Sequence, residues 1–277
     1  MADVWIFSHD CPIEDIILQP GETCDARWEN ADAIRVMMAS GDFINNTYFD
    51  ELVTQMSNEI SIENSRKLSG LKILCISGSN RINATETNSY RKCKAVINEA
   101  GKYIPDMQSE IIEMQNYALN PCIACSKCLN SKRCAIDDAF NHIYEKIIGC
   151  DILFIVSPHY APIPAKLCML FEKMGQVVSI RSSKDKLYRG ETYGIRTALI
   201  THGATAVNED AQKRNKRILN DPIAVGLHDS QLNIIPFDDE WNTGICVQPI
   251  EINTDGKTVL KTNEYVLRLL SFNGTTK

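Results

Sequence analysis

From Leu71 onwards, short and almost uninterrupted apolar runs alternate with longer amphipathic stretches. The apolar runs cover residues 71–77, 109–114, 152–156, 197–201 and 232–237. Runs of this length, apolar on both sides, predict strands that are buried on both faces of a parallel sheet. In the stretches between them, apolar residues recur every three or four positions, which predicts helices. These helices are expected at residues 85–103, 140–148 and 164–175.

The alternation of strands and helices predicts the fold class. Strands that alternate with covering helices are typical of α/β proteins with a doubly wound parallel sheet. We expect five strands in the order 2-1-3-4-5. In such a sheet, ligands bind beyond the carboxyl ends of the strands, where the strand order reverses.

The chain divides into three parts on this pattern. Residues 1–70 lack a strand pattern and are interpreted as a mainly helical extension, with helices at 27–40 and 48–60. Residues 71–237 form the sheet domain. Residues 238–277 are interpreted as a tail that contains a hairpin within 249–262 and a short helix at 263–272.

Composition and charge exclude several classes of function. The 277-residue chain has a net charge of −6 and no tract rich in lysine or arginine, so we expect no nucleic-acid partner. Its apolar runs are far too short to cross a bilayer, so we expect no membrane span. The first residues show neither the basic nor the apolar region of a secretory signal, which predicts a cytoplasmic protein.

Four cysteines within thirteen residues are the most specific chemical feature of the chain. They lie in the segment 121–135, PCIACSKCLNSKRCA, at Cys122, Cys125, Cys128 and Cys134. Thiolates are soft ligands, and three of them at successive intervals of three residues favour a compact iron–sulfur site. Structural zinc sites usually take two separated pairs, and disulfides need an oxidising compartment, so both are weaker alternatives.

The remaining cysteines and two aspartates carry simpler interpretations. Cys75 and Cys168 lie in apolar surroundings and are expected to be small core residues. Cys11 and Cys24 leave an accessory redox role open. Asp137 and Asp138 precede an apolar helical pattern and are expected to cap that helix.

Three loops follow the first, third and fourth expected strands, and their ends should meet at one edge of the sheet. The first, Ser77 to Arg81 with Asn88 and Ser89, matches neither a dinucleotide fingerprint nor a P-loop. Its small polar side chains suit either one phosphate group at a helix N-terminus or an ordinary polar turn. The loops 157–162 and 201–204 add an aromatic ring, imidazoles and a glycine. Together the three loops favour a flat, phosphorylated ligand.

With these motifs placed, residues 71–237 resemble the iron–sulfur flavoproteins, a branch of the flavodoxin-like NADPH-dependent FMN reductase superfamily. The resemblance is carried by KILCISGSNR, by the cysteine segment with the following AIDDAF, and by SPHYAPIPAKLCMLFEK. It implies a flavodoxin-like fold, an FMN cofactor, a [4Fe–4S] cluster and a homodimer or homotetramer.

The resemblance also implies roles for individual residues. The FMN phosphate would be held by Ser79, Arg81, Asn88 and Ser89. The isoalloxazine would be lined by Pro158, His159, Tyr160, Ala161, His202, Gly203 and Ala204. The cluster would be held by Cys122, Cys125, Cys128 and Cys134. The segment between Arg81 and Asn88 is longer than is usual in the family, and residues 1–70 lie outside the resemblance.

The predicted function is an oxidoreductase. Electrons would pass between ferredoxin or NAD(P)H and a small acceptor through the cluster and FMN. The alternatives are an NAD(P)H-dependent FMN or quinone reductase with structural zinc in the cysteine segment, and a non-catalytic redox sensor or electron shuttle. No catalytic acid or base is evident; His159, Tyr160 and His202 are candidates for proton transfer by position alone.

Overall fold

The computed structural model describes most of the chain from Leu68 onwards and small parts before it. The described residues are 17, 21, 29, 31–42, 49–50, 53, 68–82, 86–136, 138–160, 162–185, 187–206, 208–251 and 260–271. The chain divides into two compact units, Met1–Asn64 and Ser65–Lys277.

In the first unit, helix α1 (Ala31–Ser40) lies within the helix predicted at 27–40. Arg35 on α1 donates hydrogen bonds to the carboxylates of Asp32 and Asp50, at 2.6 and 2.7 Å. Most of the helix predicted at 48–60 lies outside the described residues.

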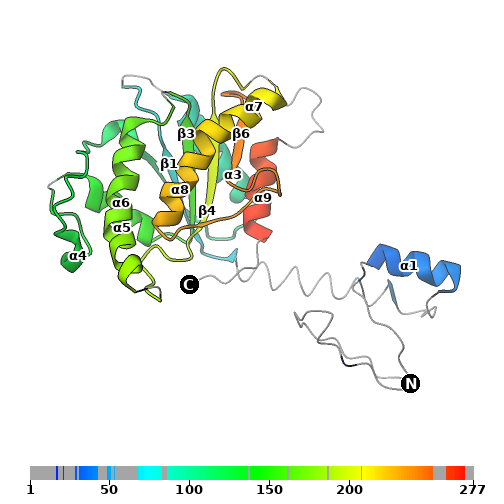
Figure 1. The fold of residues 1–277 in the computed structure, drawn as a ribbon. Coiled ribbons are helices and arrows are strands. Elements are labelled where there is room, and N and C mark those ends of the chain that lie inside the picture. Colours follow the sequence, from blue (N-terminus) through cyan, green and yellow to red (C-terminus); the bar gives the residue numbers. More distant parts are fainter. Residues whose placement is uncertain are drawn as a thin grey trace. The chain divides into compact units, whose positions relative to one another are not determined.

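The second unit is built on a parallel sheet (Figure 1). Its four long strands are β1 (Lys72–Ser77), β2 (Gln108–Glu113), β3 (Ile152–Pro158) and β4 (Arg196–His202). Every side chain of β3 and β4 is buried, as the uninterrupted apolar runs predict. The strand order β2-β1-β3-β4-β5 confirms the predicted order 2-1-3-4-5. The flavodoxin-like α/β fold is therefore confirmed.

The fifth position of the sheet is divided between two short strands, so the described sheet has six strands rather than the five predicted. Strand β5 (Asn233–Ile234) pairs with the first residues of β4, and β6 (Ile245–Val247) pairs with its last residues. The strand predicted at 232–237 is therefore shorter than expected. Part of the predicted tail, β6, instead extends the sheet.

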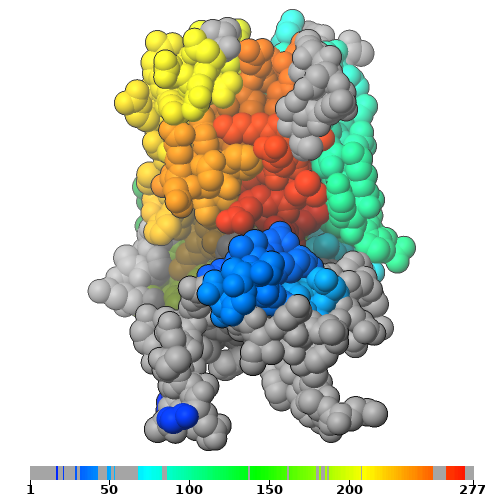
Figure 2. All heavy atoms as spheres, turned by 90° about the vertical axis from the view of Figure 1, so that its right-hand side faces the viewer, coloured from blue at the N-terminus to red at the C-terminus, as the bar shows by residue number. Residues whose placement is uncertain are grey.

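Helices cover both faces of the sheet (Figure 1). One face packs against α5 (Phe140–Ile148), α6 (Ala165–Lys184) and α8 (Asp221–Asp229). The other packs against α3 (Asn88–Ala100) and α9 (Lys261–Ser271), which contact each other. Figure 2 shows this second face, with α9 in red. The helix predicted at 263–272 thus corresponds to α9, while the hairpin predicted within 249–262 falls largely outside the described residues.

Several helical segments differ from the sequence prediction. Helix α6 continues well past Gly175, where its end was expected, because Val177 and Val178 bury in the core on its continuing turns. Three helical elements were not predicted from the sequence, namely α7 (Glu209–Asn215), the five-residue π-helix η3 (Lys216–Asn220) and α8. Two short elements also precede α5, namely the 3-10 helix η2 (Met114–Asn116) and α4 (Cys128–Ser131).

The helices that were not predicted do have a recognisable sequence pattern. Asn208 caps α7, since its side chain accepts a hydrogen bond from the backbone N–H of Ala211. Leu219, Ile223 and Leu227 are buried at intervals of four residues. A polar cap followed by this spacing predicts a helix. Among the described helices, none is both long enough and apolar enough to cross a bilayer.

Candidate functional site

The register of the sheet brings the three predicted loops to one edge. Ser77 at the end of β1 lies opposite Val156 of β3, and Pro158 at the end of β3 lies opposite His202 of β4. The loops that follow these strands therefore leave the sheet side by side. This edge, at the carboxyl ends of β1, β3 and β4, is called the sheet-edge site below.

The first loop packs closely against α6. The backbone N–H of Gly78 donates to Val156 O at 2.8 Å. A Cβ atom at this position would lie only 2.4 Å from Cδ1 of Leu167, so a larger residue would displace the loop or the helix. The close approach of the loop to α6 thus favours glycine. This constraint was not predicted from the sequence.

Ser79 and Tyr160 join the first two loops. The Ser79 side chain is buried, and its Oγ lies 3.1 Å from the Tyr160 hydroxyl. The same Oγ accepts a hydrogen bond from the backbone N–H of Arg81 at 3.2 Å. The rest of Tyr160 is 45% exposed, so its ring can cover a ligand at this edge while its hydroxyl is held. Arg81 is exposed at the rim.

Two buried polar atoms in this loop lack a partner among the described residues. They are the Ser77 hydroxyl oxygen and the side-chain oxygen Oδ1 of Asn80. Such atoms cost free energy unless a ligand or water satisfies them. A ligand that carries hydroxyl or N–H groups would do so. These residues of the first loop therefore fit the hydroxyl-bearing part of a ligand.

Ser89 and His202 form a buried pair beneath this loop. The Ser89 hydroxyl lies 2.8 Å from Nε2 of His202, and both side chains are buried. Burial, together with the nearby ammonium of Lys92, lowers the pKa of His202 to about 3. The imidazole is therefore neutral at physiological pH, which argues against His202 as a proton donor. The Ser89 hydroxyl, predicted to hold phosphate, is already engaged by this pair.

The third loop meets the second through Gly203. The His159 N–H donates to His202 O at 2.8 Å, and a Cβ on Gly203 would lie 3.1 Å from Cβ of His159. The side-chain amide nitrogen of Asn215 is also close, at 3.6 Å from that position. The structure thus brings His159, His202 and Gly203 together. Ala204 is exposed, Asn88 begins α3, and Ala161 lies outside the described residues.

Three buried polar residues near this edge were missed by the sequence analysis. Lys92 forms a 2.8 Å ion pair with Glu251, and both side chains are largely buried. Asn215 donates to the Thr205 hydroxyl at 3.3 Å. Asn220, on η3, accepts from Thr201 and donates to Ile245 O, at 2.5 and 3.1 Å. No local sequence pattern predicts these partners, because they come from distant elements.

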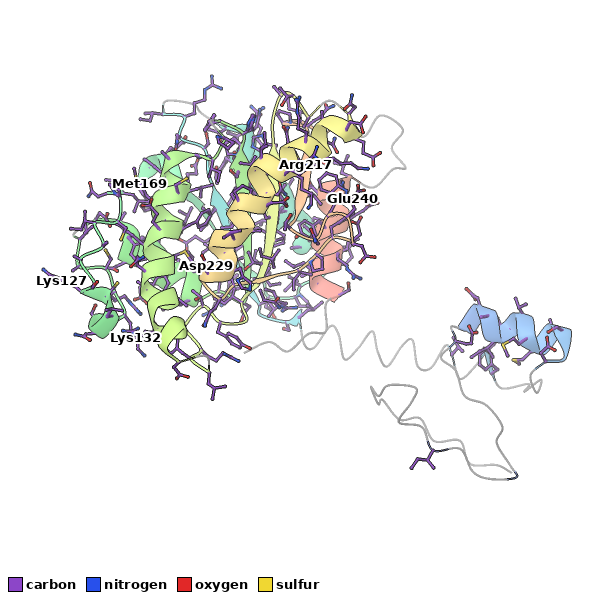
Figure 3. The ribbon with its side chains drawn as sticks, viewed as in Figure 1. Lys127, Lys132, Met169, Arg217, Asp229 and Glu240 are labelled. Carbon is purple, nitrogen blue, oxygen red and sulfur yellow. The ribbon has the colours of Figure 1, made fainter. Side chains whose placement is uncertain are left out.

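The four predicted cysteines line one cavity beside α6. Cys122, Cys125, Cys128 and Cys134 share it with Lys173, Gln176 and Val177 of that helix. The cavity encloses about 340 Å³ of atom-free space, part of it open to solvent. Figure 3 shows this cysteine segment, which carries the labelled Lys127 and Lys132, alongside α6, which carries Met169.

The backbone of the cysteine segment turns back on itself at unusual conformations. Ala124, Ser126 and Lys132 have positive φ angles of 50°, 58° and 57°. These values are uncommon for residues other than glycine and often mark functional sites. These backbone angles turn the cysteine segment back toward its own sulfur atoms. As a result, the N–H of Ala124 donates to Sγ of Cys122 at 3.5 Å.

Side chains of α5 and α6 anchor individual cysteines. Asn141 on α5 accepts from the N–H of Cys134 and donates to its carbonyl, both at 2.9 Å. Glu172 accepts from the N–H of Cys122 at 3.3 Å. Arg181 donates to the carbonyl of Cys128 at 3.1 Å. Each cysteine position named here is thus fixed by a helix that also covers the sheet.

The electrostatics show that the four thiols are neighbours. Burial raises the pKa of Cys128, and the nearby thiols of Cys134, Cys122 and Cys125 raise it further. Four thiolates at this spacing repel one another unless a cation or metal group is shared between them. Within the described residues, no three histidine, cysteine or carboxylate side chains converge on a single point that could hold one metal ion.

The comparison with protein families decides the identity. The family described as NADPH-dependent FMN reductase matches residues 71–213, slightly more than half of the chain. The chain belongs to this family. The match begins at β1 and ends within α7, so it contains all three loops of the sheet-edge site and the cysteine segment.

Two relatives of this chain are named iron–sulfur flavoproteins. One, from Methanocaldococcus jannaschii, is 31% identical over 104 residues, which cover 37% of this chain and 51% of the relative. The other, from Methanosarcina thermophila, is 25% identical over 158 residues, which cover 51% of this chain and 79% of the relative. The match spans about half the length of the first relative. These names confirm the predicted resemblance to iron–sulfur flavoproteins.

Solved structures with a related fold share little sequence with this chain. An NADH:FMN oxidoreductase in its apo form has a TM-score of 0.44 and 14% identity, over 74% of this chain and 91% of that one. Flavodoxin 1 from Bacillus cereus has a TM-score of 0.42 and 8% identity, over 72% of this chain and 97% of that one.

Proposed function

We propose that this protein is an FMN-dependent iron–sulfur oxidoreductase. It passes electrons between ferredoxin or NAD(P)H and a small acceptor through FMN and a [4Fe–4S] cluster, as a homodimer or homotetramer. The observation that carries the proposal is the placement of Cys122, Cys125, Cys128 and Cys134 around one cavity within an FMN reductase fold.

The sheet-edge site supports FMN as the cofactor. The predicted contacts are Ser79, Arg81, Asn88 and Ser89 for phosphate, and Pro158, His159, Tyr160, Ala161, His202, Gly203 and Ala204 for the ring. The oxygens of Ser77 and Asn80, which have no partner in the described part of the chain, add acceptors for ligand hydroxyl groups. The helix α3 begins at this edge, and its N-terminal N–H groups favour an anion.

The cysteine segment supports a cluster more than zinc. Structural zinc sites usually take two well-separated pairs of ligands. Here all four cysteines come from one short segment, three of them at successive intervals of three residues, and they line one cavity. Ligands spread around a cavity suit an inorganic core that offers a separate iron to each thiolate. The donor set and its arrangement therefore fit a [4Fe–4S] group.

The chain's own residues would bind, orient and shield these groups. When bound, the cluster and FMN supply the exchange between one-electron and two-electron chemistry. Tyr160 covers the sheet-edge site, and its hydroxyl is held by Ser79. Neutral His202 and Ser89 provide a fixed polar surface without a titrating charge. Proton delivery to the acceptor then falls to His159, Tyr160 or solvent.

The surface around the cysteine segment supports a protein electron donor. Lys127 and Lys132 are exposed on this segment, although the whole chain carries a net charge of −6 (Figure 3). A local positive patch attracts an acidic carrier and speeds its association at low salt. This charge contrast supports a ferredoxin-like donor at the cysteine segment.

The test is anaerobic purification with iron, sulfide and FMN measured in one sample. We expect about four iron and four sulfide per chain, one FMN, and broad absorption near 400 nm, as for cysteine-bound [4Fe–4S] clusters. Reduced ferredoxin or NADPH should then support turnover of a quinone or nitro compound. Stoichiometric zinc with FMN would instead establish the structural-zinc reductase. A protein without iron or FMN would refute the proposal.

A further inference from the structure

A buried ion pair joins α6 to the end of the cysteine segment. Lys173 of α6 donates to the carboxylate of Asp138, and their side chains are 1% and 2% exposed. Lys173 is among the largest fully buried side chains that the structure describes. The attraction within a buried ion pair seldom outweighs the free energy needed to remove both charges from water. Replacing such a pair by apolar residues of the same volume often leaves the protein equally stable or more stable. Its presence is therefore better explained by function than by stability.

The ion pair has a definite orientation. Lys173 lines the cavity that the four cysteines share, whereas Asp138 is not among the lining residues. Asp138 also accepts from the backbone N–H groups of Asn120 and Phe140, at 2.9 and 3.0 Å. Burial would raise the pKa of Asp138, but Lys173 and these N–H groups outweigh it and lower the pKa. The carboxylate is thus ionised, and the cationic member of the pair is the nearer one to the thiols.

Asp138 also fixes both ends of the cysteine segment. Asn120 lies two residues before Cys122, and Asp138 lies four residues after Cys134. One carboxylate therefore bridges the two ends of the segment and holds the ammonium of Lys173 against it. The chain places one buried positive charge beside four ligands that become negative when they bind metal.

We propose that Lys173 is a positioning residue that raises the midpoint potential of the group held by the four cysteines. The inference rests on the proposed function. Reduction adds one electron from the donor, without a bond formed or a proton taken up, so the negative charge of the site increases. A fixed cation in a medium of low dielectric stabilises the more negative state. Asp138 weakens this effect only partly, because Lys173 lines the cavity of the four cysteines and Asp138 does not.

The experiment measures the midpoint potential of reconstituted, full-length protein by an EPR-monitored redox titration. The main variant is the double change Lys173→Met with Asp138→Asn, which removes both charges and leaves no buried carboxylate unpaired. We expect it to bind as much iron and FMN as the wild type. We expect the equilibrium for one-electron reduction to shift at least tenfold toward the oxidised form, which is about 59 mV.

Two matched variants separate charge from packing. Lys173→Arg keeps the buried cation and should restore the equilibrium to within about threefold of the wild type, since guanidinium remains charged. Lys127→Met removes an exposed lysine of the same segment, where solvent screens the charge, and should change the equilibrium less than about twofold. An equal shift in Lys127→Met and in the double variant would overturn the inference.

The outcomes also distinguish this inference from the proposed function. An iron-free wild type overturns both. A loaded wild type with an unchanged potential in the double variant overturns only the role of Lys173. Loss of iron from a folded, FMN-containing double variant, with Lys173→Arg still loaded, likewise overturns it, because the pair would then serve to hold the segment in shape.

Discussion

The sheet-edge site and the cysteine segment lie in the same unit but are held in place in different ways. At the sheet edge, main-chain register places the loops, and Gly78 lets the first one pack against α6. In the cysteine segment, side chains of α5 and α6 hold a backbone with three positive φ angles. The first site therefore depends on backbone packing, and the second on individual polar contacts.

This difference predicts which changes affect which site. A substitution that alters packing at the sheet edge should impair FMN binding and stability together. A substitution that removes one polar anchor in the cysteine segment should reduce metal loading but leave the sheet intact. Helix α6 is common to both, since it follows the second loop and runs beside the cysteine segment.

Removal of thiol ligands is expected to have the largest effect and to separate the two sites most clearly. The double change Cys128→Ser with Cys134→Ser should reduce iron from about four per chain to below one, because two of four ligands are lost. FMN content should be unchanged. Metal and flavin analysis of the purified variant measures both. Cys168→Ser, outside the cysteine segment on α6, is the control and should retain iron. Parallel loss of iron and FMN would contradict the independence of the sites.

The buried imidazole of His202 predicts a pH dependence of stability. Its folded pKa of about 3 lies below the ordinary value of 6.5, so the unfolded chain binds the extra proton first as pH falls. Between pH 6 and 4 this group should lower the free energy of unfolding by about 1.4 kcal/mol per pH unit. Urea titrations across this range measure the slope.

Two variants identify the group responsible. His202→Asn retains a polar partner for Ser89 and should lose that part of the slope. His228→Gln, at an exposed position of α8, should leave the slope unchanged. An unchanged slope in His202→Asn would show that another group titrates there.

Gly78→Ala tests the packing of the first loop. The added Cβ meets Leu167 at 2.4 Å, so we expect a loss of about 1–3 kcal/mol in unfolding free energy, as for overpacked sites. FMN affinity should also fall, because the loop must move. Thermal unfolding with and without FMN measures both. Gly175→Ala on α6 meets nothing within 4 Å and should instead stabilise the protein by about 0.5–1 kcal/mol.

Asn141→Ala should produce the smallest effect and tests the anchoring of Cys134. Two hydrogen bonds of 2.9 Å to the backbone of Cys134 would be lost, at a cost of about 1 kcal/mol each at most. We expect slower iron uptake during reconstitution, with the final FMN content unchanged. Stopped-flow absorbance near 400 nm measures the rate. Reduced FMN binding with a normal iron uptake rate would contradict this assignment.

The sequence predicted the central architecture well, for a physical reason. Strands buried on both faces must be apolar throughout, so β1, β3 and β4 stand out as uninterrupted runs. The spacing of the four cysteines is likewise local, and the structure places them around one cavity. The position of the three loops at one edge of the sheet could be predicted from the strand order alone.

The features that escaped prediction depend on contacts between distant residues. The buried pair of Lys173 and Asp138 joins positions 35 residues apart, and that of Lys92 and Glu251 joins positions 159 apart. The protonation state of His202 depends on burial, which no local pattern shows. The division of the fifth position between β5 and β6 depends on pairing with β4.

That divided position has a consequence for how copies of this chain can associate. An edge of two short strands presents no continuous row of free backbone groups to a neighbouring sheet. The opposite edge, β2, carries Glu110, whose carboxylate is paired with Lys146, and Glu113. Strand-to-strand joining is therefore disfavoured on both sides. Assembly, when it occurs, has to proceed through helices and loops, the same surfaces that carry the sheet-edge site and the cysteine segment.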